Sequence, residues 1–64
     1  MNAQLVEIQC RLGALQAELE AMKIANLRRL SDNYSEAYDE EAFFYVASQM
    51  EALAQRAMEI SHEG

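Results

Sequence analysis

Only a few side chains in this 64-residue chain have the types and spacing that metal or nucleophilic chemistry requires. Glu59 and His62 have the Glu-x-x-His spacing found in di-iron carboxylate bundles. Such a site needs two of these pairs and further glutamates directed into a bundle core. Here Ile60 takes the apolar position, and the pair lies where we expect the helix to fray. We therefore predict no metal and no cofactor.

Cys10 is the only cysteine and His62 the only histidine. A nucleophilic thiol needs a histidine or another activating group nearby. An antiparallel hairpin would bring His62 back toward Cys10, but small apolar residues lie one turn from Cys10 on its own helix. We expect Cys10 to be a buried small hydrophobic residue. Because the chain also has no Gly-rich phosphate loop and no Ser-His-Asp set, we predict that it is not an enzyme.

Basic and aromatic residues gather in the middle of the chain, where Arg28 and Arg29 precede Tyr34 and Tyr38. Tyrosine with arginine is typical of interaction hot spots, so these four residues are the predicted partner-binding site. A second interpretation is local: the arginines neutralise nearby acids and complement a helix C-terminus. The tyrosine rings would then cap the core with their hydroxyls in water. The sequence leaves both interpretations open.

The composition indicates an all-α protein. The chain is 52% hydrophobic and has no proline and two glycines, which is too apolar for disorder and too poor in turn residues for a β domain. Its formal net charge of −6 disfavours nucleic acid as a partner. We find neither a signal-peptide pattern nor a stretch long enough to cross a membrane. We therefore expect a cytoplasmic protein with no membrane partner.

Apolar residues spaced alternately by three and four predict two helices, over residues 3 to about 31 and about 39 to 61. In the first helix this seam comprises Leu5, Ile8, Leu12, Leu15, Leu19 and Met22. In the second it comprises Phe43, Val46, Met50, Leu53, Ala57 and Ile60. A connector of about residues 32–38 is short enough to make the helices antiparallel neighbours, with the two seams in contact.

Each helix has a further row that the other helix would not cover. The first helix has a small-residue strip opposite its seam, consisting of Val6, Cys10, Gly13, Ala17, Ala21 and Ile24. We therefore predict an antiparallel helical hairpin that homodimerises into a four-helix bundle, with tetramers and hexamers left open. The predicted dimer interface consists of Phe44, Ala47, Ala54, Met58, Ala17 and Ile24.

Two polar residues have positions that the pattern makes informative. Asp39 is the predicted N-cap of the second helix, with Ser35 as an alternative that would start the helix earlier. Asn26 falls on a seam position, where a buried polar residue can fix register and oligomeric state. The alternative, which we favour, is that the seam has drifted by this point and leaves Asn26 exposed near the helix end.

The size, the hairpin plan and the stretch Tyr38-Asp39-Glu40-Glu41-Ala42-Phe43-Phe44-Tyr45 after an arginine-bearing helix resemble the small phage-encoded anti-activators of quorum sensing. Those proteins are dimeric two-helix hairpins that bind host proteins. The resemblance implies inhibition of a host transcriptional regulator by direct binding, in the cytoplasm of a bacterial host. It also favours Arg28, Arg29, Tyr34 and Tyr38 as contacts.

The sequence thus predicts a non-catalytic module that binds itself and a host protein and modulates that protein. One alternative is a binder or sponge for a nucleotide-like ligand held between subunits by the connector tyrosines and arginines. Another is a purely structural coiled-coil adaptor.

Overall fold

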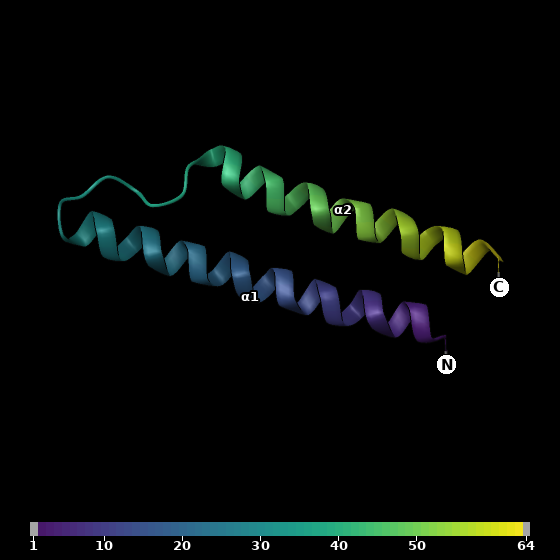
Figure 1. Ribbon diagram of the computed structural model, residues 1–64. Coiled ribbons are helices and arrows are strands. Elements are labelled where there is room, and N and C mark those ends of the chain that lie inside the picture. Colours follow the sequence, from purple (N-terminus) through teal and green to yellow (C-terminus); the bar gives the residue numbers. More distant parts are fainter. Residues whose placement is uncertain (1, 64) are drawn as a thin grey trace.

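Two antiparallel helices joined by one connector make up the part of the chain that the structure, a computed structural model, describes: residues 2–63 (Figure 1). Helix α1 spans Ala3–Ser31 and helix α2 spans Glu40–Glu63. The observed α1 has the expected bounds. Helix α2 continues through His62, where we expected fraying, and ends two residues later than expected.

The core is the predicted contact of the two seams. Its buried side chains are Ile8, Leu15 and Met22 from α1 with Val46 and Ile60 from α2. Leu19, Phe43, Met50 and Leu53 are partly buried against the cluster of Leu15, Met22 and Val46. The prediction that the 3-4 spacing marks the contact between the helices is confirmed.

Helix α1 ends in a Schellman motif, in which a residue in the left-handed conformation lets the chain reverse. Asn33 has φ of 63°, which asparagine tolerates better than most residues. The backbone N–H of Tyr34 donates to the carbonyl of Arg29 over 2.8 Å, and that of Asn33 donates to Leu30 over 3.1 Å. These two bonds satisfy carbonyls that the end of a helix otherwise leaves unpaired.

The connector returns along the last turns of α1, which extend beyond the start of α2 (Figure 1). Asn26 fixes this path: its side-chain Nδ2 donates to the Tyr38 carbonyl over 2.9 Å, and its Oδ1 accepts from the Tyr38 N–H over 2.8 Å. The favoured interpretation, that Asn26 is exposed, was wrong, and an effect of Asn26 on oligomeric state stays a prediction. Asn26 is half-buried, not exposed, and it fixes the connector of its own chain.

Helix α2 starts with the predicted N-cap. The Asp39 carboxylate accepts a hydrogen bond from the Ala42 N–H over 3.1 Å, which confirms Asp39 over Ser35. Glu40 and Glu41 follow in the first turn, where the helix dipole favours negative charge. At the start of α1, Asn2 caps in the same way by accepting from the Gln4 N–H over 2.8 Å.

The hairpin is a single layer. Its Cα atoms extend over 52 × 19 × 8 Å, so both broad faces are open. Its accessible area is 5191 Å². A folded monomer of 7.3 kDa exposes about 4,200 Å² on average, so the hairpin leaves about 1,000 Å² more surface uncovered than its mass predicts. Neither helix, over the residues described, combines the length and apolarity that a membrane span needs.

Candidate functional site

The predicted partner-binding residues lie together at the turn end of the hairpin, but some are exposed and others make contacts within the chain. Arg29 is engaged within the chain: its Nε donates to the Ser35 carbonyl over 2.7 Å. Its guanidinium carbon lies 5.6 Å from the centre of the Tyr34 ring, a cation–π distance. Arg28 is exposed, and so is Tyr38 beyond its backbone bonds to Asn26.

Large apolar side chains are exposed mainly in the same half of the molecule. Among the residues that the structure describes, those between 24 and 45 hold all but one of them: Ile24, Leu27, Leu30, Tyr34, Tyr38, Phe44 and Tyr45, with Met58 as the exception. Leu27 and Phe44 are 67% and 65% exposed. Exposed apolar side chains gathered in one region of a small protein typically mark an interaction surface.

The six residues of the predicted dimer interface are all exposed: Phe44, Ala47, Ala54, Met58, Ala17 and Ile24. The single chain therefore leaves this surface available. The small-residue strip of α1 is also open to solvent, apart from the half-buried Val6. A Cβ built on Gly13 would meet nothing within 4 Å, so no contact within the hairpin requires glycine there.

The expectation that Cys10 is buried was wrong. Its thiol is exposed, because Cys10 lies on the side of α1 opposite the seam and α2 covers only the seam side. Among the residues that the structure describes, no three of His, Cys, Asp and Glu lie close enough together to hold a metal ion.

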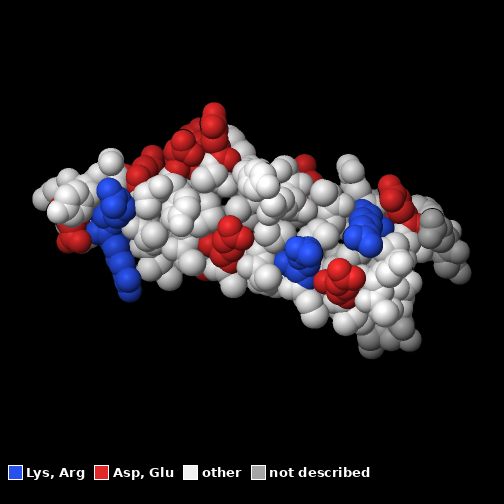
Figure 2. Space-filling model, viewed as in Figure 1, with Lys and Arg blue, Asp and Glu red and all other residues white. Residues whose placement is uncertain are grey.

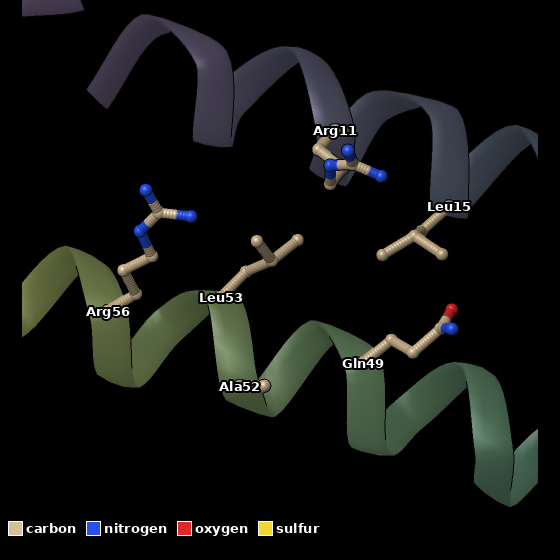
Figure 3. A pocket seen from close by; sticks show the side chains of 6 residues that line it. All are labelled: Arg11, Leu15, Gln49, Ala52, Leu53 and Arg56. Atoms are coloured by element: carbon tan, nitrogen blue, oxygen red, sulfur yellow. The ribbon is translucent and has the colours of Figure 1, made fainter. Parts of the chain in front are cut away.

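Near the open end, the two helices frame a hollow of about 330 Å³. Figure 3 shows Leu15 pointing from α1 toward α2, and Leu53 and Arg56 pointing from α2 toward α1. The complete lining is Arg11, Leu15, Gln49, Ala52, Leu53 and Arg56. The floor of the hollow is thus apolar, and both helices also contribute polar groups to the lining: two guanidinium groups and one amide.

Acidic side chains are concentrated at one place on the surface, and elsewhere acidic and basic side chains lie beside one another (Figure 2). Figure 2 shows acidic side chains gathered over the start of α2, while basic side chains lie at separate places. Over residues 2–62, the only ion pair joins Lys23 Nζ to Glu20 Oε1 at 3.2 Å. Within that range, neither Arg11 nor Arg56 has a carboxylate within 4.0 Å.

The residues of the hollow were not predicted from the sequence. A signal was present: Arg11 directly precedes seam residue Leu12, and Arg56 directly precedes seam residue Ala57. In an antiparallel pair, residues that precede seam positions share one flank of the hairpin. Which of them meet depends on the register between the helices, and the sequence does not give that register.

The chain matches no protein-family model, no curated protein and no solved structure. The fold and site therefore define a class by architecture alone: an antiparallel α-helical hairpin with a large uncovered apolar surface. The resemblance to the phage-encoded anti-activators extends to the two-helix hairpin and no further.

Proposed function

We propose that this chain is a non-catalytic interaction module that homodimerises into a four-helix bundle and binds a host protein, modulating or inhibiting it. The uncovered apolar surface of a single-layer hairpin is the observation that supports this proposal. Compact domains consist of at least two layers packed around a core, and one hairpin supplies only one.

The area supports a second copy as the occupant of part of this surface. The excess of about 1,000 Å² over an average folded monomer compares with the roughly 800 Å² that each partner buries in a stable interface. The row of Phe44, Ala47, Ala54 and Met58 runs along α2, as a lengthwise helix–helix contact requires. A dimer through this row covers Phe44 and Met58 and leaves the connector tyrosines accessible.

The turn end is the proposed contact for the host protein. Tyr34, Tyr38 and Arg28 are exposed there beside apolar side chains of α1. Arg29 acts by holding Tyr34 and the Ser35 carbonyl in place, so it shapes the surface as well as contributing to it. Inhibition of a transcriptional regulator in a bacterial cytoplasm is the form of this function that the resemblance favours.

The test is capture of a bound protein from a bacterial lysate on the tagged chain, followed by mass spectrometry. We expect one defined host protein, retained by the wild type and lost from a Tyr34→Ala, Tyr38→Ala variant with unchanged helicity. The matched control is Gln16→Ala, which changes an exposed side chain of α1 away from the turn. Capture of no protein in repeated lysates would contradict the proposal.

A further inference from the structure

We propose that the hollow between the helices, lined by Arg11, Gln49 and Arg56 over Leu15 and Leu53, binds an acidic segment of a partner protein that presents an apolar side chain between carboxylates. This inference rests on the proposed function, because it specifies the chemistry of the protein partner. It places a second contact at the open end, away from the turn.

The chemistry of the lining selects the ligand. Two guanidinium groups from different helices face one hollow, and guanidinium binds carboxylate with paired hydrogen bonds. Leu15 is buried and Leu53 is partly buried, so the floor of the hollow offers apolar contact to a bound side chain. The Gln49 amide adds a donor and an acceptor at the edge. An apolar side chain flanked by carboxylates satisfies all of these groups together.

The shape favours a segment of a protein over a small molecule. Pockets that hold small ligands enclose most of the ligand surface and occupy roughly 300–1,000 Å³. The hollow, at about 330 Å³, is at the lower end of that range and is open to solvent on one side. A side chain carried on another protein surface fills such a hollow while its own backbone covers the open side.

Neither arginine of the hollow forms an ion pair within residues 2–62. Glu7 lies one turn before Arg11, and Glu59 lies nearly one turn after Arg56. Neither comes within 4.0 Å of the arginine beside it.

The probe is the peptide acetyl-Glu-Glu-Leu-Glu-Glu-amide, titrated into labelled protein and followed by NMR. We expect the Nε–H signals of Arg11 and Arg56, the Gln49 side-chain amide and the Leu53 methyl groups to shift together. The Arg11→Gln, Arg56→Gln variant should bind about tenfold more weakly, the scale of two lost surface charge contacts. Both arginines are exposed, so the variant keeps its fold, which circular dichroism checks.

Two controls separate this site from general charge attraction. Lys23→Gln removes an exposed basic side chain of α1 that belongs neither to the hollow nor to the proposed contact at the turn end, and it should leave peptide affinity unchanged. The peptide acetyl-Lys-Lys-Leu-Lys-Lys-amide should produce no shifts at the hollow. Equal binding by the Arg11→Gln, Arg56→Gln variant, or shifts centred on Arg28, would overturn the inference.

The lysate experiment distinguishes failure of this inference from failure of the proposed function. A host protein retained by the Arg11→Gln, Arg56→Gln variant and lost on changing Tyr34 and Tyr38 overturns the hollow as a partner contact and leaves the function standing. A host protein lost from the arginine variant supports the hollow only together with peptide shifts at Arg11 and Arg56 in the titration. If no protein is captured, the function fails, and the titration alone decides whether the hollow binds acidic peptide.

Discussion

Asn26 determines where the connector lies on α1. Its side chain makes two hydrogen bonds to the backbone of Tyr38, twelve residues further along the chain. One residue thereby holds the backbone of the connector beside α1, directly before the Asp39 cap of α2.

Replacement of Asn26 by alanine should therefore lower the free energy of unfolding by about 1–2 kcal/mol, the net value of two hydrogen bonds. Hydrogen exchange at the Tyr38 amide should become faster. Chemical denaturation and NMR exchange measure both effects. The control Gln16→Ala changes an exposed amide of the same helix and should be nearly neutral. Unchanged exchange at Tyr38 would show that Asn26 does not hold the connector.

Asn33 allows the chain to reverse because it takes the left-handed conformation, with φ of 63°. Asn33→Ala should destabilise the hairpin by about 1 kcal/mol. Alanine disfavours the left-handed conformation because, unlike asparagine, it has no polar side chain that can form a local hydrogen bond. Asn33→Gly should be neutral or slightly stabilising, since glycine adopts this conformation readily. Thermal unfolding of the two variants tests the pair. Equal melting temperatures would argue against a left-handed residue at this position.

The elements themselves follow from the sequence to a large extent. The 3-4 spacing marked Ile8, Leu15 and Val46 as core residues because helical packing repeats with that period. Asp39 was recognisable as a cap because its carboxylate can reach the free amides of the next turn. These features depend on neighbours within a few residues, so local sequence is sufficient to predict them.

Features that join distant parts of the chain were not predictable. The bonds of Asn26 to Tyr38 require knowledge of the connector path, which is set by a left-handed residue at Asn33. The hollow of Arg11 and Arg56 requires the register between the two helices. Burial of Cys10 was wrongly expected because a small apolar row can face either a second helix or water.

Substitution of Gly13 tests whether another helix covers the side of α1 opposite the seam. Within the hairpin an added Cβ meets nothing, so Gly13→Ala should raise helicity and stabilise α1 by about 1 kcal/mol. The reverse change at its exposed neighbour, Ala14→Gly, should destabilise the helix by a similar amount. Circular dichroism with thermal unfolding measures both. A loss of stability in Gly13→Ala would show that another helix approaches this position closely.

At the scale of the whole molecule, the flat single layer explains why a second copy is expected. One seam buries five side chains, and a chain of 64 residues has no disulfide within itself and little further core to stabilise it. A dimer adds a second layer and covers the row that includes Phe44 and Met58.

The mass of the protein in solution tests this account most directly. Sedimentation equilibrium should give twice the chain mass of 7.3 kDa for the wild type. The Phe44→Gln, Met58→Gln variant should shift toward the single-chain mass, because it removes apolar contacts from the proposed interface. Tyr45→Gln changes an equally exposed aromatic residue on the other flank of α2 and should leave the dimer intact. A wild-type mass of 7.3 kDa at micromolar concentration would contradict the account.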